Sequence, residues 1–155
     1  MGDSQFFQSL VEKLQVIVQC KKVSLYLLDS SGTRLELKAG PDAEYDKQQA
    51  TKEYSYDYGA GVTGWIAQQG KFDQKERENP NKTFVGVPLK TFEGKVLGLF
   101  KAEDKIGENP TFTDVDVAVA ESVADLAALA IAIRLELEEF HRIFLALSDE
   151  KGRID

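Results

Sequence analysis

The segment G-A-G-V-T-G-W-I-A-Q-Q-G, residues 59–70, is the stretch from which the fold is inferred. Gly59 and Gly61 can adopt positive φ angles at little steric cost, so the backbone can turn sharply there. Thr63 is a typical N-cap for a short helix, and Gly70 stands where a C-cap glycine is expected. Free N–H groups at the start of such a helix attract anionic or hydrogen-bond-accepting groups. The segment therefore indicates either one wall of a ligand pocket or a tight strand-to-helix connection without a ligand.

Five stretches around that segment have the pattern of β-strands. Residues 33–39 alternate most clearly, so Leu35, Leu37 and Ala39 are expected on one face. The stretch 96–102 is apolar on both faces, which predicts a central strand. Short turns predict that the first two and the last two strands form antiparallel hairpins. The expected strands are residues 23–29, 33–39, 53–58, 84–89 and 96–102.

Helices are expected near both ends of the chain. Residues 4–20 carry one apolar stripe, and we expect that helix to end at Cys20, a small buried residue. The second helix is expected to span residues 114–147, and Thr113 with Asp116 resembles a capping box at its start.

Along the second helix, apolar residues recur at steps of four and three, a period of 3.5 residues that is typical of helices that pair with another helix. This heptad stripe consists of Val119, Val123, Leu126, Ala130, Ile133, Leu137, Phe140, Phe144 and Leu147. Alanines in the first half would let the helix lie close to a sheet. We expect residues 134–155 to form a stalk that pairs with a second copy of the chain; the alternative is a core helix within one subunit.

Composition excludes several classes of function. The chain has 155 residues and a formal net charge of −7, without the basic clusters that nucleic-acid binding requires. No apolar run is long enough to span a membrane, and no signal peptide is recognisable, so a soluble, cytoplasmic protein of one domain is expected. We expect no nucleic-acid partner and no membrane contact in this segment.

No catalytic or metal-binding constellation is found. A single cysteine, Cys20, and a single histidine, His141, exclude most metal sites and nucleophilic triads. Acidic residues are scattered and form no pair in an apolar setting. We therefore expect no catalytic residue, no metal and no cofactor.

Four motifs in this order resemble a GAF domain: G-x-G-V-T-G-W-I-A-Q-Q-G-K, then V-P-L, then V-L-G-L-F-K-A-E-D-K, and finally F-T-D-V-D before an alanine-rich helix. The resemblance covers residues 7–137. It implies an α+β, GAF/PAS-like fold with a six-stranded antiparallel sheet. The N- and C-terminal helices would lie on one face, and loops and short helices would frame a pocket on the other. The single domain would have its core at about residues 5–133.

The resemblance also implies a function. The chain would be a non-catalytic sensory module of a signalling protein that binds a small molecule, dimerises through its C-terminal helix, or does both. The alternative is a dimerising connector that carries no ligand. The expected ligand-binding residues are Tyr56, Tyr58, Thr63, Trp65, Phe84 and Phe100.

Sequence signatures of GAF subfamilies narrow the range of ligands and reactions to be expected. Relatives that bind cyclic nucleotides carry a dispersed Asn-Lys-Phe-Asp-Glu signature. Here Lys105, Phe112 and Asp116 match it, whereas Asp104 replaces Asn and Val117 replaces Glu, so cyclic-nucleotide binding is a minor alternative. We expect Lys105 and Asp116 to form a structural salt bridge. Covalent bilin attachment, methionine sulfoxide reduction and haem binding each lack the cysteine or histidine that they require.

Overall fold

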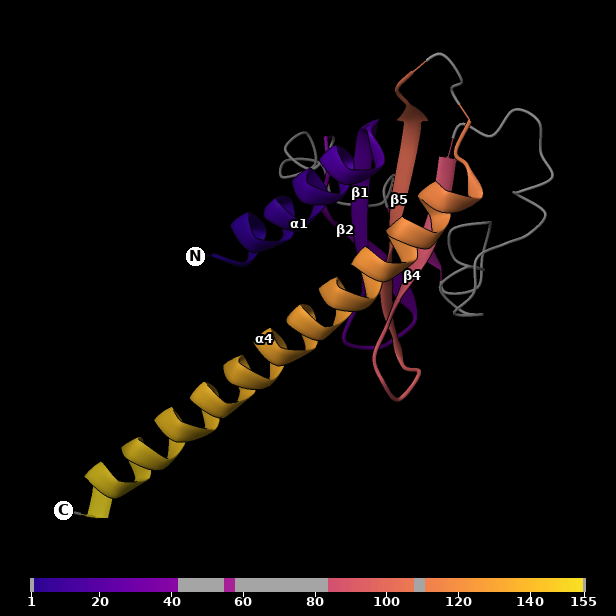
Figure 1. The fold of residues 1–155 in the computed structure, drawn as a ribbon. Coiled ribbons are helices and arrows are strands. Elements are labelled where there is room, and N and C mark those ends of the chain that lie inside the picture. Colours follow the sequence, from indigo (N-terminus) through magenta and orange to yellow (C-terminus); the bar gives the residue numbers. More distant parts are fainter. Residues whose placement is uncertain (1, 42–54, 58–83, 108–110, 155) are drawn as a thin grey trace.

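The computed structural model describes residues 2–41, 55–57, 84–107 and 111–154; for residues 55–57, 84, 153 and 154 it describes the backbone alone (Figure 1). The elements in chain order are α1 (Asp3–Val18), β1 (Cys20–Leu28), β2 (Arg34–Ala39), β3 (Ser55–Asp57), β4 (Phe84–Lys90), β5 (Val96–Lys105) and α4 (Asp114–Ile154). All five strands lie where the sequence pattern predicted them.

The strands form one antiparallel sheet in the order β3-β2-β1-β5-β4. Both predicted hairpins are present, and β5 lies inside the sheet between β1 and β4, as its two apolar faces indicated. The α+β class and the antiparallel sheet with terminal helices are confirmed. The resemblance implied six strands, whereas the described residues form five.

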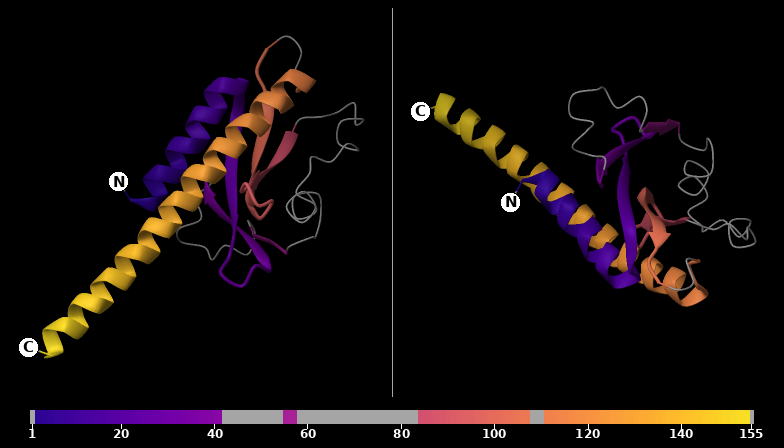
Figure 2. Two further views of the ribbon diagram at one scale, coloured as in Figure 1. Left: turned by 60° about the horizontal axis from the view of Figure 1, so that its bottom comes forward. Right: turned by 90° about the horizontal axis from the view of Figure 1, so that it is seen from above.

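Both helices cover the same face of the sheet and run antiparallel to each other (Figure 2). α1 packs on β1 and β2, and α4 packs mainly on β4. The core between them is closely packed: Leu14, Leu25 and Phe100 are completely buried in it. Burial of such side chains contributes about 1.5–3 kcal/mol each, which makes this layer the main source of stability.

The end of α1 differs from the prediction. The helix ends at Val18, and Cys20, expected to close it, begins β1 and pairs with Lys105. Gln19 causes the reversal because it adopts a left-handed conformation, with φ 54°, while its backbone N–H donates to the carbonyl of Gln15. The burial expected for Cys20 is confirmed, and burial raises the pKa of its thiol.

The clean alternation predicted for β2 is interrupted. Leu35 and Leu37 face away from the helices, but Ala39 packs in the helix-side core. The reason is a bulge: the register of β1 and β2 shifts between Leu25 and Tyr26. An extra residue in one strand makes each side chain beyond it point to the opposite face of the sheet.

Gly98 allows β5 to approach β1 closely. A Cβ atom at this position would lie 1.9 Å from the carbonyl oxygen of Tyr26 and 2.8 Å from the Cα atom of Leu27. Since both atoms belong to the backbone of the central strand, no side-chain movement can relieve the overlap. Gly98 is therefore required by backbone packing.

Lys105 joins three elements at one end of the sheet. Its ammonium donates to the last carbonyl of α1, that of Val18, at 2.6 Å and to the carboxylate of Asp116 at 3.1 Å. Asp116 also accepts from the backbone N–H of Thr113 at 2.9 Å, and its own N–H donates to the Thr113 hydroxyl at 3.1 Å. The predicted capping box and the predicted salt bridge are both confirmed.

Electrostatics at this junction favour the charged form of Asp116. Burial raises the pKa of this carboxyl, but hydrogen bonds from the Thr113 N–H and the Lys105 ammonium outweigh that effect and bring the pKa below its ordinary value. The lysine and aspartate side chains are only 14% and 17% exposed, so solvent screens the pair less than a surface ion pair.

We expect Gly98→Ala to destabilise the domain by about 3 kcal/mol or more, because the added methyl group overlaps the β1 backbone. Gly152→Ala is the matched control: nothing lies within 4 Å of its Cβ position, and alanine favours a helix by about 1 kcal/mol. Urea unfolding followed by circular dichroism measures both. A Gly98→Ala variant as stable as the parent would contradict the close approach.

We expect Asp116→Ala to lower the free energy of unfolding by about 2 kcal/mol at pH 7, because it removes half of the capping box and leaves the half-buried Lys105 without its carboxylate partner. The Asp116 carboxylate makes its full contribution to the free energy of unfolding above the pKa of the unfolded state. This contribution is lost as the pH falls through the lower pKa of the folded state. The difference between parent and variant should therefore shrink below about pH 4. Asp125→Ala, an exposed aspartate on α4, is the control; equal losses in both variants would refute the junction's role.

Candidate functional site

The sheet face turned away from the helices is the first candidate surface. Its centre is apolar and completely shielded from solvent: Leu35 and Leu99 have no exposed surface, and Tyr26 is 4% exposed. The half-buried side chains around this cluster are those of Leu28, Leu37 and Val96. The ligand pocket was expected on this side of the sheet.

Polar groups accompany this apolar cluster. Ser24, buried in β1, pairs in register with Lys101 of β5, whose ammonium lies 3.9 Å from the Glu103 carboxylate. Alternation along β5 puts Lys101 and Glu103 on the same face as Leu99. A half-buried cation beside a buried hydroxyl is suited to hold an acidic group of a ligand.

The structure describes the six predicted site residues to different extents. Tyr58, Thr63 and Trp65 lie outside the described residues. Tyr56 is described only in its backbone, which pairs in register with Leu35, and the backbone of Phe84 pairs with Glu103.

Phe100 is placed on the face opposite to the one expected. It is completely buried among the residues that pack against α1 and α4, and it pairs in register with Val87 of that same core. Leu99 takes its place on the face turned away from the helices. The sequence contains a signal for this placement, because Val85, Val87 and Leu89 form a core stripe on the neighbouring strand. An aromatic side chain by itself does not indicate which face of a strand it occupies.

α4 is the second candidate surface, and its two long sides differ in residue size. The side against the sheet is built from small residues that are at most 4% exposed, with Ile131 the largest: Val117, Ala120, Ala124, Ala127, Ala128 and Ile131. Small side chains allow the helix backbone to approach β4 closely. The predicted alanine face is therefore confirmed as the packing face.

The heptad stripe lies on another side of α4 and is largely exposed. Its larger members have exposed fractions from 49% to 69%: Leu126, Ile133, Leu137, Phe140, Phe144 and Leu147. Every residue from Leu135 to Gly152 is exposed, and this half of α4 projects away from the sheet in Figure 1. Apolar exposure on this scale is typical of an interaction surface.

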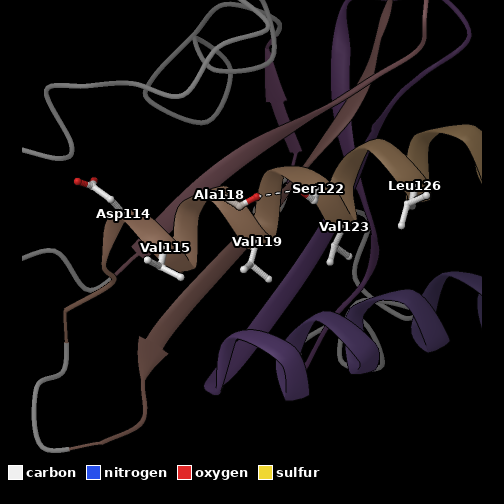
Figure 3. Close-up of a pocket in the computed structure, with 7 residues that line it drawn as sticks. All are labelled: Asp114, Val115, Ala118, Val119, Ser122, Val123 and Leu126. Carbon is white, nitrogen blue, oxygen red and sulfur yellow. Dashed lines mark hydrogen bonds between the residues drawn. The ribbon is translucent and has the colours of Figure 1, made fainter.

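An open groove marks the start of the stripe. It has a volume of about 470 Å³, and Figure 3 shows Val119, Val123 and Leu126 projecting from one edge of α4. The other lining residues are Asp114, Val115, Ala118 and Ser122. Because Val119, Val123 and Leu126 belong to the heptad stripe, the groove and the exposed half of α4 form one continuous apolar surface.

Arg134 marks the point where α4 leaves the domain. Its guanidinium donates to the Asp3 carboxylate at 2.8 Å, lies 3.9 Å from Glu138 and stacks 4.8 Å above the centre of the Phe6 ring. The hydrogen bond from Arg134 holds the pKa of Asp3 below its ordinary value. Sequence patterns did not reveal this contact, since it joins residues 131 positions apart.

The described part of the chain lacks two further kinds of feature. No helix there is both long and apolar enough to cross a bilayer. No group of three or more histidine, cysteine, aspartate or glutamate side chains could hold a metal ion among those same residues.

The sequence matches one family model, that of the GAF domain, over residues 4–133. No curated protein matches it. Among solved structures, the second GAF domain of DevS from Mycobacterium smegmatis superposes with a TM-score of 0.67 at 13% identity, covering 90% of this chain and 99% of that one.

Two further structures are similar. The GAF domain of an Acinetobacter phosphoenolpyruvate-protein phosphotransferase has a TM-score of 0.63 at 18% identity, covering 85% of this chain and 83% of that one. A methyl-accepting chemotaxis protein has a TM-score of 0.65 at 18% identity, covering 88% of this chain and 92% of that one. Identities this low establish a common fold and nothing more.

Proposed function

The chain belongs to the GAF domain family, and we propose that it is a non-catalytic sensory module that passes a binding event to an output domain through α4. GAF domains are typically sensory or regulatory modules of signalling proteins. The observation that carries the proposal is the continuity of α4: one helix of 41 residues packs on the sheet and then extends beyond it with its apolar stripe exposed.

The ligand would bind on the sheet face away from the helices. Its apolar floor would be Leu99 and Tyr26, which are buried there, and Lys101 would receive an acidic group of the ligand. We propose that the walls are formed by the remaining predicted residues, Tyr56, Tyr58, Thr63, Trp65 and Phe84. Phe100 is left out because it belongs to the opposite core.

The signal would leave through α4, and we propose that two copies of the chain pair along its heptad stripe. Ligand binding on β5 would act on α4 through β4 and β5, the strands on which the helix packs. The Lys105 junction ties β5 to the first turn of α4 through the ion pair with Asp116, so it would connect the two surfaces.

A ligand-free connector is the alternative function. It is favoured by the complete burial of Leu35 and Leu99, because a sheet face that is already shielded needs no ligand to cover it. In that case α4 would still pair, but no small molecule would change the pairing. Cyclic-nucleotide binding remains a minor alternative, and the burial of Val117, at 4% exposed, shows that this position is used for core packing.

We expect a small acidic molecule to stabilise the domain, because it would pair with Lys101. Nucleotides, amino acids and small organic acids should be screened by thermal unfolding. A ligand at a hundredfold excess over its Kd raises the free energy of unfolding by about 2.7 kcal/mol. Trp65 is the sole tryptophan, so its fluorescence reports binding beside the predicted wall.

Two lysine variants test whether the ligand binds at Lys101. Lys101→Met should abolish the response, whereas Lys95→Met, in the exposed β4–β5 turn, should leave it intact. No response from any of the three compound classes would contradict the sensory proposal and favour the connector.

We expect Leu137→Glu to weaken self-association by about a hundredfold or more, because pairing would bury a carboxylate in the centre of the stripe. Leu145→Glu is the control: Leu145 is 50% exposed but lies outside the stripe, so its Kd should stay within about threefold of the parent. Sedimentation equilibrium measures both. A parent chain that stays monomeric at high concentration would overturn the proposed pairing.

A further inference from the structure

Among the residues that flank the heptad stripe, Glu136 and His141 are a pair that can carry opposite charges. We propose that the α4 helices of two copies pair in parallel and in register, and that Glu136 of each copy contacts His141 of the other. This inference rests on the proposed pairing along the stripe and adds to it an orientation, a register and a dependence on pH.

Heptad geometry places these two residues. With Val123, Ala130, Leu137 and Phe144 at position a, the other stripe residues, such as Phe140, occupy position d. Glu136 then directly precedes an a residue, which is position g, and His141 directly follows a d residue, which is position e. In a parallel pair, each g residue faces the e residue five positions later on the other helix, and 136 plus 5 is 141.

Both side chains are available for this contact. Glu136 and His141 are exposed, and they lie on the part of α4 that projects beyond the domain. On its own helix His141 faces Glu138, one turn earlier. The guanidinium of the neighbouring Arg142 donates a hydrogen bond to the Glu139 carboxylate and therefore faces Glu139. Among described residues, no other element packs against this part of α4.

The remaining g and e positions of the stripe offer no competing charge pair. They would bring together Ser122 with Ala127, Leu129 with Arg134, and Ile143 with Ser148. Arg134 is already bonded to Asp3 within its own subunit. The Glu136–His141 contact, formed twice by symmetry, is therefore the polar contact that can select an orientation.

Antiparallel pairing is less favourable for the same residues. Two antiparallel registers overlap nearly the whole stripe. One places Glu136 opposite Leu129, and the other places Glu136 opposite its own copy. Neither gives Glu136 an opposite charge, and the second opposes like charges. The parallel register also matches every stripe residue with itself, including those that line the groove in Figure 3.

This arrangement makes pairing depend on pH. An imidazole becomes a cation as the pH falls below about 6.5, whereas a glutamate stays ionised down to about pH 4.3. A contact between a histidine and a glutamate across the two subunits is therefore stronger at pH 5.5 than at pH 8.0. Two exposed ion pairs of about 0.5 kcal/mol each correspond to about a fivefold change in Kd.

Disulfide trapping tests the orientation. Cys20 is 1% exposed, so a cysteine introduced on the stalk reacts in its place. Leu137→Cys should form a disulfide between two copies under mild oxidation, because position a faces itself in a parallel, in-register pair. A mixture of Leu137→Cys and Ile133→Cys chains should give no mixed disulfide. The mixed product without the Leu137→Cys homodimer would show antiparallel pairing and overturn the inference.

Sedimentation at pH 5.5 and pH 8.0 tests the contact. The parent should bind itself about fivefold more tightly at the lower pH. His141→Gln should remove the pH dependence, and His141→Lys should pair tightly at both pH values. Glu139→Gln, outside the stripe and its flanks, should behave as the parent does. The same pH dependence in His141→Gln would overturn the contact.

The two experiments separate this inference from the proposed function. A dimer that crosslinks in the antiparallel sense, or that ignores pH, leaves pairing along the stripe intact and refutes only the parallel contact. A chain that does not associate, at either pH and with or without oxidation, refutes the pairing and this inference together.

Discussion

Close packing of α4 on the sheet is the constraint on which the rest of the structure depends. Alanines at positions such as Ala124 and Ala128 bring the helix backbone against β4, and larger residues there would push the helix away. Because the small residues of α4 face the sheet, its larger side chains lie on its other sides. The helix therefore buries its small residues within the subunit and presents its large apolar residues to the outside.

The second half of α4 receives no stabilisation from the domain. An isolated helix of this length is marginally stable in water, and most helical stability in proteins comes from packing an apolar face. Arg134 and the Lys105 junction hold the first half at both ends, but residues 136–152 are all exposed. In the proposed pairing, a second copy that covers the heptad stripe would supply this packing, and the stalk would then carry the signal.

Much of the fold followed from the sequence because its signals are local. The positions of the strands, the turns and the capping box at Thr113 depend on neighbouring residues, and all were confirmed. The errors arose where one residue changes the register or the direction of the chain. The left-handed Gln19 moved Cys20 from helix to strand, and the bulge opposite Leu25 turned Ala39 to the core. No pattern of side chains indicated either change. The pocket face was predicted less well, since Phe100 was assigned by its chemistry and belongs to the other side by its pairing.

Amide hydrogen exchange at two protein concentrations tests the central claim, that the stalk is ordered by a second copy, most directly. Above the dissociation constant, the amides of residues 136–150 should exchange slowly, and below it they should exchange rapidly, while those of β1 stay protected at both concentrations. Exchange in the stalk that is the same at both concentrations, fast or slow, would contradict the account.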